Sequence, residues 1–288
     1  MEQKDWILLK TLYEERNMTR TAEKLYVSQP SLSYRLRNLE ENLGVSIFFK
    51  TKKGVEFTSE GEYLVDYSRE MLKQFQFMKD TMSNMKDKVS GTLRIGVSSN
   101  FAQYLLPRVL KEFSNNYPNV RFNVKTGWST QVIEFLNNSS VHVGILRNIR
   151  GWHGEKILLK NEALYLISKE KINMDILPEY RLINYNTDSS LKESITSWWA
   201  DQFSEPANIE MEVDRLETCK EMVKNNLGFA VVPGICLKQD DDLYQQAIYF
   251  KDGTPVTRET WLVYNQLFEN LSVVNHFVNY LKQWNEED

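Results

Sequence analysis

Apolar residues at three- and four-residue spacing predict helices at the start of the chain. A first helix is expected over residues 3–16, with one apolar face formed by Trp6, Leu9, Leu12 and Tyr13. Thr19 is suited to cap a second helix over residues 20–25. Ser28 is the expected cap of a third helix, which Gly44 ends. The buried stripe of this third helix is formed by Leu32, Leu36, Leu39 and Leu43.

Two short helices, a tight turn and a third helix that begins in small hydrogen-bonding residues are typical of a helix-turn-helix. The last helix of this motif presents its first turn to base edges in the major groove of DNA. We therefore predict a DNA interface on the second and third helices. Its candidate residues are Thr19, Arg20, Ser28, Gln29, Ser31, Ser33, Tyr34, Arg35 and Arg37.

Two short, largely apolar segments, residues 47–49 and 55–57, flank a basic turn that contains Gly54, which predicts a two-stranded wing. Lys50, Lys52 and Lys53 at its tip are suited to contact phosphates, which hold a protein in register on DNA without reading its sequence. The same pattern also fits a structural or protein-binding subdomain, because charged loop tips are usually just solvated.

The segment from Thr19 to Ser33 resembles the signature of the LysR family of bacterial transcriptional regulators. Further matching positions are Leu39-Glu40, Leu43-Gly44, Phe48-Phe49, Thr58 and Gly61. The resemblance implies a winged helix-turn-helix DNA-binding domain over residues 1–58 of a homo-oligomeric regulator that is not an enzyme. Implied partners are a double-stranded DNA operator, a second copy of the chain in a homodimer or homotetramer, and RNA polymerase. Thr21 and Tyr34-Arg35 depart from residues common in the family, so the operator sequence is left open.

Residues 59–90 predict one long linker helix, because they contain no proline and a single early glycine. Apolar residues recur along it at heptad spacing, interrupted by Ser68. This stripe either packs on the chain's own body or forms an antiparallel dimer seam, and the resemblance favours the seam. Its expected residues are Leu64, Met71, Phe75, Met78, Met82 and Met85. A dimer would hold two recognition helices one DNA turn, about 34 Å, apart.

From residue 91 short apolar strands alternate with helices, which predicts a doubly wound parallel α/β sheet. The first group of strands is expected at residues 93–97, 120–125 and 141–146, with helices at 104–113 and 132–136. The second group has strands at residues 163–168, 181–185, 209–213 and 229–232, and a helix at 216–225. Residues 259–264 and 271–284 should return to the first group as a strand and a helix. Ligands of such sheets bind beyond the carboxyl ends of the strands.

Residues 91–288 also resemble the two-lobed, periplasmic-binding-protein-like effector domain of LysR regulators, and residues 226–233 match that family's glycine-to-proline stretch. The resemblance implies an effector between the lobes. Strand-end hydroxyls and arginines suit a carboxylate or phosphate, so an organic acid is the expected effector. The wing and the arginines also resemble those of LysR members that sense citrate, which implies citrate as one candidate. The candidate residues are Ser98, Ser99, Asn100, Ser129, Thr130, Arg147, Thr218, Pro233 and Arg258.

Alternatives to this effector site stay open. Arg147 and Arg258 are equally suited to salt bridges, on the surface or between the lobes, and helix capping explains Thr218 as well. A constitutive DNA-binding protein whose body only oligomerises is the alternative function. His142, where many family members have aspartate, is expected to be partly exposed at a strand edge.

Composition narrows the function further. The formal net charge of the 288 residues is -4, but residues 1–58 carry +2, which permits DNA binding. Cys219 and Cys236 are too few for a disulfide framework, and no cysteine–histidine cluster suggests zinc. The histidines lie in no spacing typical of a nucleophile or metal site, so an enzyme is disfavoured and no cofactor is expected. Without a signal peptide or an apolar run of about 18 residues, the chain is expected to be soluble and cytoplasmic, with no membrane contact.

Overall fold

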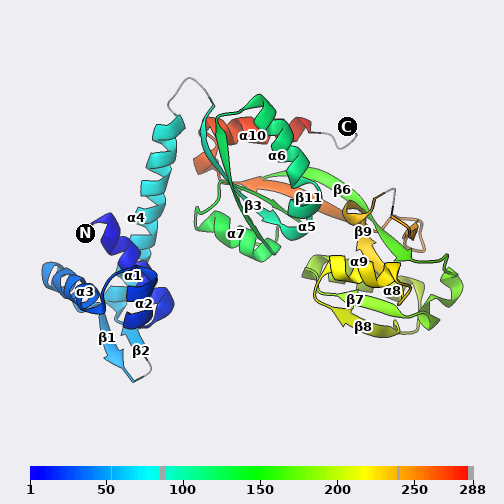
Figure 1. The fold of residues 1–288 in the computed structure, drawn as a ribbon, viewed down its shortest axis with the longest axis horizontal. Helices are drawn as coiled ribbons and strands as arrows, with labels where there is room; N and C mark the ends of the chain where they lie inside the picture. Colours follow the sequence, from blue (N-terminus) through cyan, green and yellow to red (C-terminus); the bar gives the residue numbers. More distant parts are fainter. Residues whose placement is uncertain (53, 85–88, 239–240, 285–288) are drawn as a thin grey trace. The chain divides into compact units, whose positions relative to one another are not determined.

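The computed structural model describes residues 1–52, 54–84, 89–238 and 241–284 (Figure 1). The chain forms two compact units, Met1–Met85 and Lys86–Asp288. The first unit is mainly helical and the second is α/β, each with a hydrophobic core of its own. This is the fold class that the sequence predicts.

The first unit consists of three helices, a hairpin and a long helix, as expected. The long helix was expected over residues 59–90, however, and residues 89 and 90 are not helical. In chain order the elements are α1 (Gln3–Glu15), α2 (Met18–Lys24), α3 (Gln29–Leu43), β1 (Phe48–Thr51), β2 (Gly54–Phe57) and α4 (Ser59–Asn84). The fully buried core side chains include Leu9, Leu12, Leu36, Ile47 and Val65. Leu43, expected in the buried stripe of α3, is instead exposed, because it is the last residue of the helix and lies beyond the core.

The caps of the short helices explain where the chain turns. The Ser28 hydroxyl accepts a hydrogen bond from the Ser31 amide at 3.3 Å, and Gly44 ends α3 with a φ of 68°, as predicted. The prediction that Thr19 caps α2 is wrong. The Asn17 side chain accepts from the amides of Thr19 and Arg20 at 2.9 and 3.0 Å, so α2 begins one residue after Asn17 and Thr19 lies inside its first turn.

Two glycines let the wing approach the helices closely. A Cβ on Gly54 would lie 2.4 Å from the carbonyl oxygen of Arg16, which accepts a hydrogen bond from the Val55 amide at 2.8 Å. A Cβ on Gly61 would lie only 1.9 Å from the carbonyl oxygen of Ile47. The hairpin is therefore joined to α1 at one end and to the start of α4 at the other.

The second unit is built on a seven-stranded mixed sheet. Its strands are β3 (Gly91–Ser98), β4 (Val120–Gly127), β5 (Val143–Leu146), β6 (Glu155–Ser168), β9 (Ala230–Pro233), β10 (Tyr244–Ala247) and β11 (Thr257–Tyr264). The order is β10-β6-β11-β5-β3-β4, with β9 also paired to β6. Only β3, β4 and β5 run parallel; β11 is antiparallel to β5, and β6 is antiparallel to β9, β10 and β11. The expectation of a wholly parallel sheet is wrong, because β11 returns to the first lobe in the opposite direction.

The sheet joins two lobes. The first lobe holds β3, β4, β5 and β11 with α5 (Ser99–Tyr104), α6 (Leu106–Asn116), α7 (Ser129–Asn137), η3 (Gln266–Phe268) and α10 (Ser272–Gln283). The second lobe holds β9, β10 and a parallel pair, β7 (Leu182–Tyr185) and β8 (Ile209–Val213), with η1 (Met174–Glu179), α8 (Ser189–Gln202), α9 (Leu216–Lys224) and η2 (Gly234–Cys236). Strand β6 belongs to both, since residues 155–163 pair with β11 and residues 164–168 pair with β9 and β10.

Two local expectations for the second unit are corrected. The helix expected over residues 104–113 is divided at Leu105, where α5 ends and α6 starts with Pro107 in its first turn. His142 is fully buried rather than partly exposed. Its Nδ1 accepts a hydrogen bond from the Arg94 amide at 3.2 Å, and its ring lies 5.0 Å from that of Phe268, so it belongs to the core behind β3.

Candidate DNA interface and candidate effector site

Most of the predicted DNA-contacting residues are exposed on α2, α3 and the turn between them. The exposed set is Thr19, Arg20, Ser28, Gln29, Ser31, Tyr34 and Arg37, whereas Ser33 is half-buried. Tyr26, which the sequence analysis left out, is 95% exposed in this turn and has a φ of 54°. A large aromatic residue in the short turn between the second and third helices was the sequence signal that could have singled it out.

Arg35 differs from that set because it binds α1. Its Nε donates to Asp5 Oδ1 at 2.6 Å, and its Nη2 donates to Glu2 Oε2 at 3.2 Å. The hydrogen bond to Asp5 raises the pKa of Arg35 above its ordinary value. The structure thus gives Arg35 a role in fastening α3 to α1, and its contact with DNA stays a prediction.

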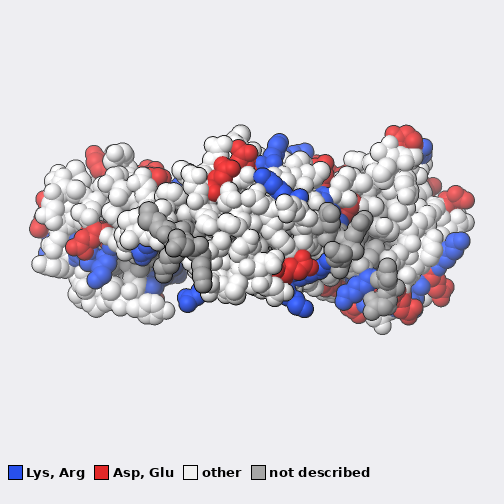
Figure 2. Space-filling model, turned by 90° about the horizontal axis from the view of Figure 1, so that it is seen from above, with Lys and Arg blue, Asp and Glu red and all other residues white. Residues whose placement is uncertain are grey.

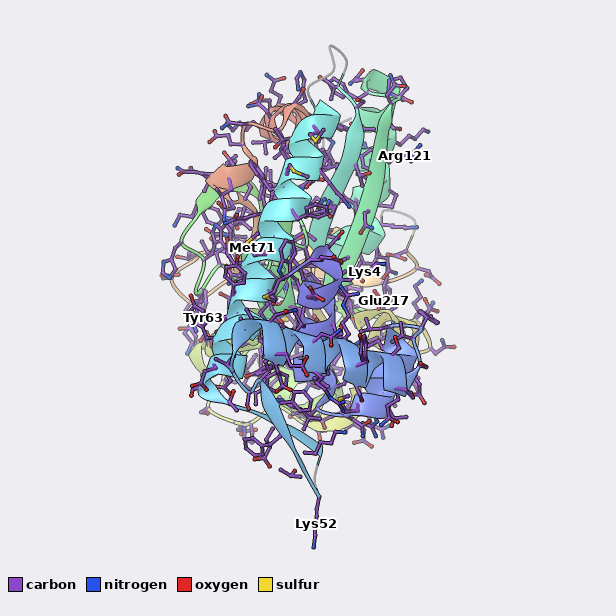
Figure 3. All side chains as sticks on the ribbon, turned by 90° about the vertical axis from the view of Figure 1, so that its left-hand side faces the viewer. Lys4, Lys52, Tyr63, Met71, Arg121 and Glu217 are labelled. Carbon is purple, nitrogen blue, oxygen red and sulfur yellow. The ribbon has the colours of Figure 1, made fainter. Side chains whose placement is uncertain are left out.

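On the face shown in Figure 2, basic and acidic side chains are interspersed rather than gathered in one patch, which agrees with the small net charge. Lys50 and Lys52 on the wing are both exposed, and Lys52 projects from the hairpin tip (Figure 3). Lys53 lies outside the described residues. Phosphate contact by Lys50 and Lys52 stays a prediction.

The residues of the predicted dimer seam differ in their burial along α4. Leu64 packs against the core of the first unit, so it is used within the chain. Met71 and Phe75 are half-buried, while Met78 and Met82 are exposed. Met85 lies outside the described residues. Exposed methionines one helical turn apart form an apolar stripe that a second helix could cover, and dimerisation through it stays a prediction.

A cavity of about 460 Å³ lies between the two lobes of the second unit. Its walls are the carboxyl ends of β3, β4 and β5, the segment after β7 and the start of α9. Six predicted residues line it: Ser98, Ser99, Asn100, Ser129, Arg147 and Arg258. Thr130 instead lines a smaller adjoining cavity.

The structure does not bring Thr218 or Pro233 to this cavity, which corrects their predicted placement. The wall formed by α9 ends at Glu217, one residue before Thr218. Pro233 is buried at the end of β9, where its carbonyl oxygen accepts the Cys236 thiol at 3.0 Å.

Both arginines of the cavity are buried in ion pairs. The pair of Arg258 with Asp188 joins the two lobes, as the alternative interpretation held, whereas the pair of Arg147 with Glu162 lies within the first lobe. Arg147, 5% exposed, donates from Nη1 to Glu162 Oε1, and the other oxygen of Glu162 accepts the Ile235 amide at 2.7 Å. Arg258, 7% exposed, donates from Nη2 to Asp188 Oδ2. Burial lowers the pKa of Arg258, and the neighbouring positive charge of Arg147 lowers it further.

These ion pairs leave donors unused. Nε and Nη2 of Arg147, Nε and Nη1 of Arg258, and the Ser98 hydroxyl are buried with no hydrogen-bond partner among the described residues. Each unpaired buried polar group costs about 1–3 kcal/mol. A cluster of such donors around one cavity is therefore a feature that an acceptor from outside the chain would stabilise.

Sequence reasoning missed the second lobe's share of the cavity and one residue of the first lobe. Tyr185, Asn186, Thr187 and Asp188 line the cavity from the second lobe, and Trp128 lines it from the first. Asp188 also caps α8, because its Oδ1 accepts the Leu191 amide at 3.0 Å. Its capping position in the polar run before α8 could have been recognised from the sequence, but α8 itself was not predicted.

Metal binding, thiol chemistry and membrane insertion have little support in the described ranges. They contain no group of three or more histidine, cysteine, aspartate or glutamate residues placed to hold a metal ion. Cys219 and Cys236 are buried free thiols, and burial raises the pKa of each to about 12. No helix within the described part of the chain is both long and apolar enough to cross a membrane.

Comparison with known proteins covers both units. Residues 4–62 match the family described as "Bacterial regulatory helix-turn-helix protein, lysR family", and residues 86–286 match the LysR substrate binding domain. The chain is 49% identical over 282 residues to the uncharacterised HTH-type transcriptional regulator YraN of Bacillus subtilis (strain 168), covering 98% of each protein. It is 32% identical over 291 residues to YkuM of the same organism, covering 100% of this chain and 99% of YkuM.

Solved structures agree on the fold. Full-length CbnR in complex with its target DNA has a TM-score of 0.68 at 19% identity, covering 98% of this chain and 99% of CbnR. A full-length variant of OxyR from Pseudomonas aeruginosa has a TM-score of 0.66 at 20% identity, covering 98% of this chain and 95% of OxyR.

Proposed function

The chain belongs to the LysR family of DNA-binding transcriptional regulators, and on that premise we propose that a small, multiply anionic metabolite binds between its lobes and modulates operator binding. The observation that carries this proposal is the set of unpartnered donors on Arg147, Arg258 and Ser98. Buried donors of this kind require acceptors, and the residues that line the cavity leave them unpaired.

The free atoms of Arg147 favour a carboxylate. Nε and Nη2 lie on the same edge of a guanidinium group, and both are free because Glu162 binds Nη1. That edge matches the two oxygens of a carboxylate, which it can bind through two parallel hydrogen bonds. Arg147 therefore offers a complete two-point site for one carboxylate of the ligand.

The second arginine of the cavity favours a ligand with more than one negative group. Arg258 keeps unpaired donors on Nε and Nη1 in the same cavity as those of Arg147, so two acceptor groups could be held at once. A di- or tricarboxylate, with citrate as one candidate, would place one carboxylate on each arginine.

Regulation would follow from the position of the ligand. A ligand held by residues of both lobes stabilises one arrangement of the lobes, and it shifts operator binding by no more than its differential affinity for the two arrangements. The proposed partners are a double-stranded operator, a second copy of the chain in a homodimer or homotetramer, and RNA polymerase. Exposed Met78 and Met82 on α4 support pairing of two copies.

Titration calorimetry of the full chain with citrate and a series of dicarboxylates would test the anion site. The variant is Arg147→Gln combined with Glu162→Gln, because removing either partner alone would leave an uncompensated buried charge. We expect the double variant to lose acid binding and to keep its affinity for promoter DNA. Equal acid binding by the double variant would overturn the proposal. Intact DNA binding without binding of any acid by the unsubstituted chain would favour a constitutive DNA-binding protein.

A further inference from the structure

Arg35 belongs to the helix that is predicted to read DNA, yet two carboxylates of α1 bind it. Its side chain is 36% exposed, whereas those of Arg147 and Arg258 are 1% and 7% exposed. We propose that Arg35 reads one guanine of the operator, and that Asp5 and Glu2 are positioning residues that aim it. This inference rests on operator binding in the proposed function and does not depend on the anion site of the second unit.

The two carboxylates occupy one edge of the guanidinium group. The Nε–H of an arginine points along the edge that it shares with Nη2, and Asp5 Oδ1 accepts it at 2.6 Å. Glu2 Oε2 accepts Nη2 at 3.2 Å, and the Glu2 amide donates to Asp5 Oδ2 at 2.6 Å, so both acceptors approach from the same side. Nη1 has no hydrogen-bond partner among the described residues, and Nη2 carries a second N–H. The end of the group, formed by Nη1 and Nη2, is therefore left to bind two acceptors.

This free end matches guanine better than phosphate. An arginine can donate two parallel hydrogen bonds to O6 and N7 of guanine, the commonest specific contact in the major groove. Those acceptors are neutral, so the carboxylates of Glu2 and Asp5 do not repel them. A phosphate is charged, and the same two carboxylates would repel it while Arg35 attracted it. The local charges thus favour contact with a base over contact with the DNA backbone.

The position of Arg35 on α3 agrees with this role. Arg35 lies on one face with Ser31, Tyr34 and Asn38, at three- and four-residue spacing, and these four residues line one surface cavity beside Glu2. Ser31 lies in the first turn of α3, the turn that a recognition helix presents to base edges. Arg35 follows one turn later, so it is on the face of α3 that is expected to meet the DNA.

Asp5 is the more firmly held of the two carboxylates. It is 5% exposed and completes the capping box of α1, whereas the side chain of Glu2 is 75% exposed. An arginine that is already held in one geometry avoids an entropy cost that a free side chain would incur on binding. A fixed donor pair also discriminates against bases whose acceptors lie elsewhere. We therefore expect Asp5 to affect which base is selected more than how tightly DNA in general is bound.

Selection from a pool of DNA duplexes with a randomised central segment tests the reading of guanine. The full chain and its Arg35→Gln variant each select sequences, with no effector added. Arg35→Gln should replace one guanine of each half-site by adenine, because glutamine pairs with the edge of adenine as arginine does with guanine, and other positions should not change. Competition titrations against sites with that guanine altered should show discrimination of about five- to a hundredfold in the unsubstituted chain, and none in Arg35→Gln.

Asp5→Asn tests the positioning role, because asparagine keeps an acceptor for the Glu2 amide but has no charge to hold Arg35. Guanine should remain preferred, with several-fold less discrimination at that position. Asp5→Asn combined with Arg35→Gln leaves neither charge of the pair, so it should fold even if a single variant does not, and it should select the same site as Arg35→Gln alone. Glu41→Gln is the matched control, since it removes an exposed carboxylate of α3 and should leave the guanine preference unchanged.

Each outcome bears on a different claim. A selected site that Arg35→Gln leaves unchanged would overturn the reading of guanine, and a uniform loss of affinity with a smaller salt slope would identify a phosphate contact in its place. Unchanged discrimination in Asp5→Asn, or a further change of site when it is added to Arg35→Gln, would overturn the positioning role. Failure of the anion site would alter none of these results. Absence of any selected sequence with the unsubstituted chain would overturn this inference together with operator binding.

Discussion

Gly61 lies where α4 leaves the wing, and replacing it with alanine should loosen this joint. The new Cβ would lie 1.9 Å from the carbonyl oxygen of Ile47 and 2.9 Å from its carbonyl carbon, so the backbone would have to move. That same oxygen accepts hydrogen bonds from the amide and hydroxyl of Thr58 at 3.1 and 3.2 Å. Displacing it therefore disturbs the turn that starts α4.

The expected loss of stability follows from these contacts. Overpacking costs about 1–3 kcal/mol, and each weakened hydrogen bond costs about 1 kcal/mol. Alanine returns only about 1 kcal/mol through its better helix propensity. We therefore expect Gly61→Ala to lower the unfolding free energy of the first unit by about 3 kcal/mol. Gly44→Ala is the matched control, because no atom lies within 4 Å of its Cβ, and only the φ of 68° opposes alanine, at about 1 kcal/mol.

Hydrogen exchange of the full chain measures this difference locally. Amides of α1 and of the first turns of α4 should exchange about a hundredfold faster in Gly61→Ala and about fivefold faster in Gly44→Ala, since about 1.4 kcal/mol corresponds to a factor of ten. Peptides from α10 in the second unit serve as the internal reference. Unchanged exchange in Gly61→Ala, or equal effects of the two substitutions, would refute the steric argument.

Three other predictions concern the wing, the thiols and the cap of α2. Lys52→Gln should weaken binding to cognate and random DNA equally and reduce the salt slope by about 1; a loss confined to cognate DNA would mean that the wing reads bases. Cys219 and Cys236, with pKa values raised to about 12 by burial, should not react with a thiol reagent at pH 8 until the chain is denatured; rapid reaction of the native chain would contradict this. Asn17→Ala should lower the unfolding free energy by about 1 kcal/mol in denaturant titrations, whereas Asn17→Ser should keep the cap; equal losses would exclude the capping role.

The helix-turn-helix could be predicted well because its signals are local. Ser28, Gly44 and the spacing of the leucines act within one or two helical turns, and the structure confirms the elements that they predict. The cap of α2 was assigned two residues late because Asn17 and Thr19 are both good capping residues. Only the backbone of the structure shows that Asn17 has the extended conformation of a cap.

The second unit shows where sequence reasoning ends. Part of the cavity could be predicted from the carboxyl ends of β3, β4 and β5, because parallel strands end at one edge of a sheet. The direction of β11 and the partners of Arg147 and Arg258 depend on residues far away in the chain. Asp188 lies 70 positions before Arg258, and no local pattern indicates that the two meet.

Strand β6 has a mechanical consequence. Its partner changes from β11 to β9 between Ala163 and Leu164, next to Glu162, and Glu162 lies directly opposite Arg258 in the strand register. A continuous hydrogen-bonded strand can twist but cannot slide past its neighbours, so we expect any relative motion of the lobes to be a rotation about this point. Atoms close to a fulcrum move least, and the buried charges of the cavity are therefore close to the axis, while the outer ends of both lobes travel farthest. A rotation too small to break the ion pair at Glu162 would therefore still produce a larger displacement at the outer end of each lobe.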